Sequence, residues 1–178
     1  NNIALQFTFE GKENAAFAQK IVRFFESITP VFPFLTQFNF TISSHNSFPH
    51  SSGIASSASS MSALALCLCS MERNLFGTLK EETAFLQKAS YIARLGSGSA
   101  ARSVYPKLAI WGETTEVLGA SNDYAVAYTD KLHPFFENYH DDILIVSRKE
   151  KAVSSRAGHA LMNDNPYANV RYEQANTN

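Results

Sequence analysis

The sequence has little of several features that mark common classes of protein. It contains only two cysteines in 178 residues, and its formal net charge is −1. So few cysteines exclude a disulfide-rich scaffold, and a chain of this length can bury roughly two thirds of its unfolded surface without such bridges. The near-zero charge offers no basic excess for nucleic acid and no polybasic face for a membrane. We therefore expect neither nucleic acid nor a membrane as a partner.

Long apolar runs are also missing. The longest, from Met61 to Cys69, is too short to cross a bilayer as a helix. The first residues show no positively charged stretch followed by an apolar one, which a secretory signal would need. Cys67 and Cys69 do not face each other on a helix, so we expect two buried, reduced thiols and a cytoplasmic protein.

The sequence does contain a mixture of strand and helix patterns. Apolar residues alternate as in half-buried strands, or recur at the spacing of one helix face. Strands are predicted at 3–9, 37–44, 107–113, 123–128 and 142–147, and helices at 15–27, 56–72, 77–95, 97–105 and 153–163. This mixture predicts the α+β or α/β class.

A serine-rich stretch, "SSGIASSASS" (51–60), leads directly into the apolar run. Ser56 and Ser57 are good helix-capping residues, and a helix start carries free amides and partial positive charge. Gly53 and Ala55 would let the backbone approach a bulky anion. Because the helix that follows is apolar on nearly all sides, it should be buried and hold its start rigid. The pattern predicts a phosphate-binding loop, although a capped core helix would use the same residues.

Two further stretches repeat this design. "RLGSGSAARS" (94–103) combines glycines and the hydroxyls of Ser97 and Ser99 with Arg102, a side chain that can clamp an anion with two parallel bonds. "VSSRAG" (153–158) again places hydroxyls beside an arginine, Arg156. Three such segments predict a ligand with several phosphates, unless the arginines form surface ion pairs.

The first stretch resembles the phosphate loop of the kinase superfamily that includes galactokinase, homoserine kinase, mevalonate kinase and phosphomevalonate kinase. "GSGSAARS" and "VSSRAG" are similar to the Gly-Ser-Gly-Ser-Ala-Cys-Arg-Ser and Val-Ser-Ser-Thr/Arg-x-Gly segments of the diphosphomevalonate decarboxylases. The resemblance covers about 48–158. It implies the superfamily's two-layer α+β fold, whose N-terminal half is related to a ribosomal-protein domain. We expect a phosphate-binding domain over 1–150, incomplete at its N-terminus, and the truncated start of a second over 151–178.

The same resemblance implies an activity. The decarboxylases phosphorylate mevalonate 5-diphosphate with ATP and Mg²⁺, and loss of phosphate and carbon dioxide gives isopentenyl diphosphate. A homodimer is implied as well. The family's aspartate that contacts the reacting hydroxyl has no counterpart here, so we expect a fragment that is inactive alone.

The implied site residues fall into three sets. The catalytic residue is Arg102. The substrate-binding residues are Ser97, Gly98, Ser99, Ala100, Ala101, Arg102, Ser155, Arg156 and Asn165. The residues that would bind the ATP phosphates are Ser52, Gly53, Ala55, Ser56 and Ser57. No residue of this chain is implied as a metal ligand.

Other activities remain open. A related decarboxylase or kinase could act on mevalonate 5-phosphate or another mevalonate derivative. A complete chain of this length could be a non-catalytic module that binds a phosphorylated ligand. A serine hydrolase is disfavoured, because "LGSGSA" lacks the spacing of a Gly-x-Ser-x-Gly elbow. His133, His140, Asp141 and Asp142 match no metal-ligand spacing, so a solvated loop is favoured there.

Overall fold

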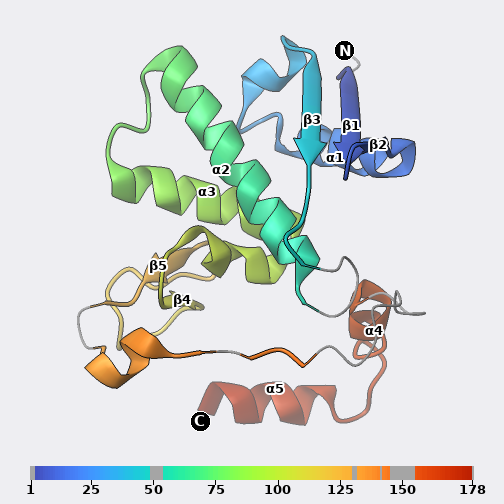
Figure 1. Cartoon of the computed structure of the whole chain (residues 1–178). Coiled ribbons are helices and arrows are strands. Elements are labelled where there is room, and N and C mark those ends of the chain that lie inside the picture. The colour runs from blue at the N-terminus through green and yellow to red at the C-terminus, as the bar shows by residue number, and fades with distance from the viewer. Residues whose placement is uncertain (1–2, 49–53, 130–131, 141, 145–154, 178) are drawn as a thin grey trace.

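The structure is a computed structural model that describes residues 3–48, 54–129, 132–140, 142–144 and 155–177. It begins with a small sheet of three strands, β1 (Leu5–Phe9), β2 (Lys12–Glu13) and β3 (Phe40–Ser44), in the order β2-β1-β3. β1 and β2 are antiparallel, whereas β1 and β3 are parallel and joined through the helix α1 (Ala15–Ile28). Figure 1 shows the two parallel strands side by side with α1 near their base.

The crossover between β1 and β3 is held by aromatic side chains. Phe7 of β1 stacks on Phe17 of α1 with ring centroids 4.8 Å apart, and Phe25 meets Phe40 of β3 edge to face at 5.1 Å. α1 ends in a turn and the short 3-10 helix η1 (Pro33–Thr36), where the ring of Phe32 is completely buried. The alternating apolar residues of β1 and β3 thus form strands as the sequence predicts.

The centre of the molecule is a pair of long helices, α2 (Ser56–Phe76) and α3 (Glu82–Gly96), followed by the 3-10 helix η2 (Gly98–Val104). Their contact surfaces consist largely of small residues, and Ala65, Ala89, Ala93 and Ala100 are completely buried. Small side chains let helix backbones approach closely, so α2, α3 and η2 form one packed unit (Figure 1). The predicted helices at 56–72 and 77–95 are confirmed, and Gly77 ends the first with a φ of +66°.

The two cysteines of α2 have different surroundings. Cys69 is completely buried, and burial raises the pKa of its thiol to about 12. Cys67 is exposed, so the expectation that both thiols are buried is wrong. Because successive helix positions differ by about 100° around the axis, two residues of the same apolar run can face opposite environments.

Few of the described residues after η2 are buried. β4 (Ala109–Trp111) and β5 (Ala125–Ala127) form an antiparallel hairpin below α3 and η2. The elements that follow are η3 (Pro134–Asn138), α4 (Ser155–Ala160) and α5 (Ala168–Thr177). The strand predicted at 142–147 is not formed at 142–144, and its other residues lie outside the described ones. Within the described ranges, no helix has the length and apolar character needed to span a membrane.

Candidate phosphate-binding site

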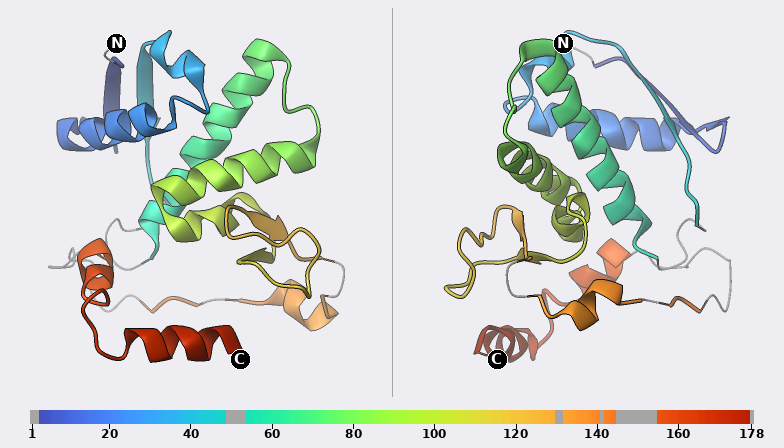
Figure 2. Two further views of the ribbon diagram at one scale, coloured as in Figure 1. Left: turned by 180° about the vertical axis from the view of Figure 1, so that it is seen from behind. Right: turned by 60° about the vertical axis from the view of Figure 1, so that its left-hand side comes forward.

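Two of the serine-rich motifs meet in space. Ser57 at the start of α2 and Ser97 just before η2 are forty residues apart in sequence, yet their Oγ atoms are 3.5 Å apart. The helix α2 also packs on η2. The views in Figures 1 and 2 show η2 tucked beside α3 and close to the lower end of α2. The fold therefore joins the two predicted phosphate-binding segments into one site.

The start of α2 is not capped by its serines. The N-cap residue is Ala55, which has a φ of +47° and no side chain that could accept a hydrogen bond. The carbonyl of Ala55 accepts from the amides of Ala58 and Ser59. The expectation that Ser56 and Ser57 cap the helix is therefore wrong. The hydroxyl of Ser57 instead pairs with that of Ser97, while the amides of Ser56 and Ser57 have no partner in the described part of the chain and could donate to an anion.

The glycines of the second motif permit close packing. A Cβ at Gly96 would lie 2.5 Å from Sδ of Met61 in α2, and one at Gly98 would lie 3.1 Å from the indole ring of Trp111 in β4. Real Cβ atoms essentially never come as close as the first distance, so a side chain at Gly96 would require the flexible side chain of Met61 to move. The two glycines thus bring the motif against α2 on one side and against the β4–β5 hairpin on the other.

Arg102 is exposed on η2, five residues after Ser97 in the sequence. Its guanidinium lies 5.9 Å from the ring centroid of Trp111, and it forms no ion pair with any described residue. Arg94, in contrast, donates to the Asp123 carbonyl at 2.6 Å and to its carboxylate at 3.1 Å. Among the described residues, Arg102 therefore does not form the surface ion pair that was the alternative for it, whereas Arg94 binds Asp123 next to β5.

The alanines of the motif contribute differently from its serines. Ala100 and Ala101 are completely buried, so their methyl groups face the protein interior. The amide of Ala100 already donates to the Ser97 carbonyl at 2.8 Å. Ser97 is half-buried, and Gly98 and Ser99 are exposed on the same loop. Within 97–102, the residues that have a polar side chain and are not buried are thus Ser97, Ser99 and Arg102.

The third motif is only partly described. α4 begins at Ser155, so a helix starts where the sequence predicts one, and in all three views it lies near the N-terminal end of α2 (Figures 1 and 2). The side chains of Ser155 and Arg156 lie outside the described parts, as do Ser52 and Gly53 of the first motif. Asn165 is exposed, and its Oδ1 accepts from the amide of Tyr167 in the turn before α5.

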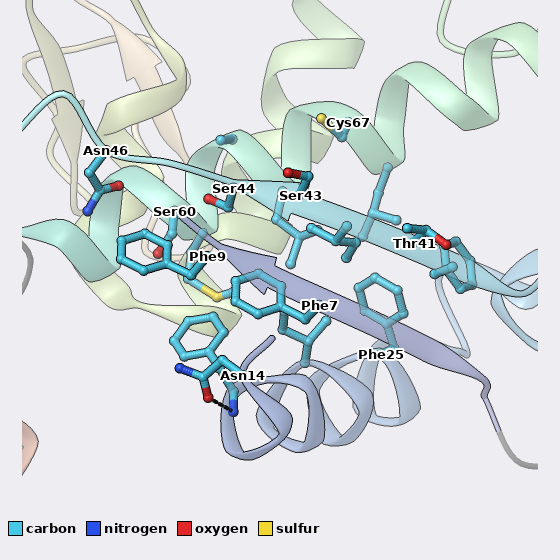
Figure 3. A pocket seen from close by; sticks show the side chains of 18 of the residues that line it. Phe7, Phe9, Asn14, Phe25, Thr41, Ser43, Ser44, Asn46, Ser60 and Cys67 are labelled. Carbon is cyan, nitrogen blue, oxygen red and sulfur yellow. Dashed lines mark hydrogen bonds between the residues drawn. The ribbon is translucent and has the colours of Figure 1, made fainter. Parts of the chain in front are cut away.

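A cavity of about 600 Å³ adjoins the start of α2, and no sequence pattern predicts it. It lies between the strands, α1 and α2, and its wall is mostly aromatic and aliphatic, including Phe7, Phe9 and Phe25 (Figure 3). Ser43, Ser44, Asn46 and Ser60 supply polar groups, and Cys67 faces it from α2. A smaller cavity of about 320 Å³ lies between α3 and the hairpin and includes Tyr105, whose pKa is raised to about 12 by burial and then by Tyr124.

Comparison with known proteins agrees with the motifs. Residues 3–125 match the model of the diphosphomevalonate decarboxylase-like N-terminal domain. Curated diphosphomevalonate decarboxylases of Ganoderma lucidum and Debaryomyces hansenii are 33% identical over 126 residues and 34% identical over 133 residues. These alignments cover 71% and 75% of this chain but 29% and 31% of the relatives, so the chain spans about a third of their length.

A solved structure is similar over nearly the whole chain. The crystal structure of mevalonate diphosphate decarboxylase from Staphylococcus aureus superposes with a TM-score of 0.71 at 26% identity. The match covers 98% of this chain and 49% of that protein. This similarity includes the incomplete α+β architecture described above, and it extends beyond the residues matched by sequence.

Proposed function

Because the chain belongs to the diphosphomevalonate decarboxylase-like N-terminal domain family, we propose that it serves in the ATP-dependent decarboxylation of mevalonate 5-diphosphate to isopentenyl diphosphate. The observation that carries this proposal is the meeting of the two serine motifs at 3.5 Å beside an arginine without an ion-pair partner among the described residues. A substrate with a diphosphate and a carboxylate offers several anionic groups to such a cluster of donors.

The two motifs would have separate tasks within this site. Ser97, Ser99 and Arg102 would hold the diphosphate and carboxylate of the substrate. The loop 52–57, with the free amides of Ser56 and Ser57, would hold the phosphates of ATP. Free amides at the start of a buried helix suit phosphate oxygens, because they add hydrogen bonds to the positive end of the helix dipole.

ATP with Mg²⁺ would supply the phosphoryl group that is transferred to the substrate's tertiary hydroxyl and then lost. The chain's own residues bind and orient. Arg102, which is exposed in this structure, would contribute about 1.5–3 kcal/mol through a charge-assisted bond if the bound substrate excludes water from it. Its contribution to catalysis would be greater if the bond strengthens as charge develops in the transition state.

The outer residues complete the proposal. Ser155, Arg156 and Asn165 would contact the substrate from the rim, supported by the position of α4 near the start of α2. Gly98, Ala100 and Ala101 would contribute through the backbone and the shape of the loop. We place the protein in the cytoplasm as a homodimer, both on the family resemblance.

The test is turnover by the intact polypeptide that contains this chain. Carbon dioxide release with ATP, Mg²⁺ and mevalonate 5-diphosphate is the expected result. Faster turnover of mevalonate 5-phosphate would instead favour a monophosphate decarboxylase, and phosphorylation without carbon dioxide release would favour a kinase. Binding of ATP and the diphosphate without any turnover would show a non-catalytic module.

A further inference from the structure

A buried hydroxyl outside all three motifs connects η2, which carries Arg102, to α3 and β5. Ser90, in the middle of α3, is completely buried. Its Oγ donates to the carbonyl of Ala101 in η2 at 2.7 Å and accepts from the amide of Ala125 in β5 at 2.8 Å. One side chain therefore bridges three separate elements, α3, η2 and β5.

We propose that Ser90 is a positioning residue for η2, the segment that carries Ser99 and Arg102; this inference rests on the proposed function. Ala101 directly precedes Arg102, so the first bond fixes the backbone from which the guanidinium extends. Ala125 pairs with Trp111 in the hairpin, and Trp111 is the ring that lies against Gly98 and beside Arg102. The second bond therefore fixes the surface on which Arg102 rests.

The position of Ser90 requires a small side chain that both donates and accepts a hydrogen bond. A hydroxyl can donate one hydrogen bond and accept another at the same time, and Ser90 does both. Removing it would leave a buried carbonyl and a buried amide each without this partner, a loss that costs more than an exposed bond. Serine is also a poor choice for a helix interior on local preference, so its presence at the centre of α3 fits a role in tertiary structure.

The protein carries its own reporter for this role. Trp111 is the single tryptophan among these 178 residues, and its ring lies against Gly98 at the start of η2. A change in the position of η2 relative to the hairpin should therefore alter the tryptophan emission without any added label. A loss of overall stability that left the folded loop in place would lower the melting temperature but would not change this emission.

The experiment compares Ser90→Ala with Ser62→Ala in the full chain. Ser62 is the matched control, because it is also buried but its Oγ bonds only to the Ser59 carbonyl of its own helix. Tryptophan emission, its quenching by iodide, and the affinity for inorganic diphosphate are measured on protein shown to be folded by circular dichroism. We expect Ser90→Ala to shift the emission to longer wavelength, raise the quenching, and weaken diphosphate binding about fivefold to tenfold, consistent with the loss of one or two buried bonds. Ser62→Ala should match the unchanged chain in all three.

Two results would overturn the proposal. One is a folded Ser90→Ala variant with unchanged emission and affinity, and the other is a Ser62→Ala variant that changes as much. If the unchanged chain fails to bind diphosphate, the proposed function is in error, while the emission still decides the role of Ser90. Should Ser90→Ala not fold, hydrogen exchange on the unchanged chain decides instead: the Ala125 amide should exchange as slowly as the centre of α3, and fast exchange would refute the bridge.

Discussion

The starts of α1 and α2 solve the same physical problem in opposite ways. Both helices follow a strand of the same small sheet, and both begin with amides that lack partners in their own helix. At α1, Oδ1 of Asn14 accepts from the Phe17 amide at 3.0 Å, which caps the helix. At α2 the cap position is Ala55, with a φ of +47° and no side-chain bond, although two serines follow it.

This difference separates stability from binding. The capped start of α1 has its polar groups satisfied within the protein, and nearby Phe7 and Phe17 pack over it. At the start of α2 the amides of Ser56 and Ser57 have no partner in the described part of the chain, and the hydroxyl of Ser57 meets that of Ser97. Because α2 lacks the side-chain cap that α1 has, we expect the start of α2 to bind a ligand.

The largest effect should come from Arg102→Ala, at the uncapped side. In the intact protein we expect turnover to fall at least about tenfold, because a charge-assisted bond of about 1.5–3 kcal/mol is lost. Arg102→Lys should recover only part of the rate, since an ammonium cannot form the two parallel bonds. Steady-state kinetics and thermal melting are measured together. An unfolded variant, or one with normal turnover, would show that Arg102 does not act in the site.

Asn14→Ala should have the next largest effect, and on stability alone. Loss of the cap should lower the free energy of unfolding by about 1 kcal/mol, which lowers the melting temperature by about 2–4 °C in a chain of this size. Diphosphate affinity should not change. Asn14→Ser keeps an oxygen that can cap and should restore most of the loss. An Asn14→Ala variant with the same free energy of unfolding as the unchanged chain would mean that the cap contributes nothing. It would also remove the contrast between the two helix starts.

Ser57→Ala should show the reverse behaviour. Because Ser57 does not cap α2, the free energy of unfolding should stay within about 0.5 kcal/mol of the unchanged chain. Its hydroxyl lies 3.5 Å from that of Ser97, at the edge of the shared site. We expect affinity for ATP, measured by calorimetry, to fall about threefold. A drop in stability as large as that of Asn14→Ala would indicate that the serine caps the helix after all.

The smallest effect should come from Ala55→Gly. A left-handed φ of +47° is strained for alanine but not for glycine. Part of the relief is offset by the greater freedom of glycine in the unfolded chain, so we expect stabilisation of a few tenths up to about 1 kcal/mol. Ala15→Gly, at the first residue of α1, is the matched control and should destabilise. Urea unfolding of both variants measures the difference, and equal signs would contradict the strain at Ala55.

Some sequence predictions failed for local reasons. Serines next to an apolar helix predict a cap, but the helix begins at Ser56, one residue earlier than capping by Ser56 would require, so that the cap position is Ala55. The strand predicted at 142–147 rests on alternation and β-branched residues, yet Leu144 is 90% exposed and no strand forms at 142–144. A strand needs a paired neighbour and a buried face, and neither follows from a short apolar pattern alone. The polar residues at 168–177 form α5, which no apolar period predicts.

The sequence by itself determined the local elements and the chemistry of the site. Glycines, hydroxyls and one arginine at fixed spacing predict an anion-binding segment, because backbone freedom and donor type are properties of single residues. Tertiary structure alone decided that the segments at Ser57 and Ser97 meet, that Arg94 pairs with Asp123, and that Ser90 bridges three elements. These are contacts between residues far apart in the chain. They depend on how closely α2, α3 and the hairpin pack, and that distance is set by buried side chains from all of them at once.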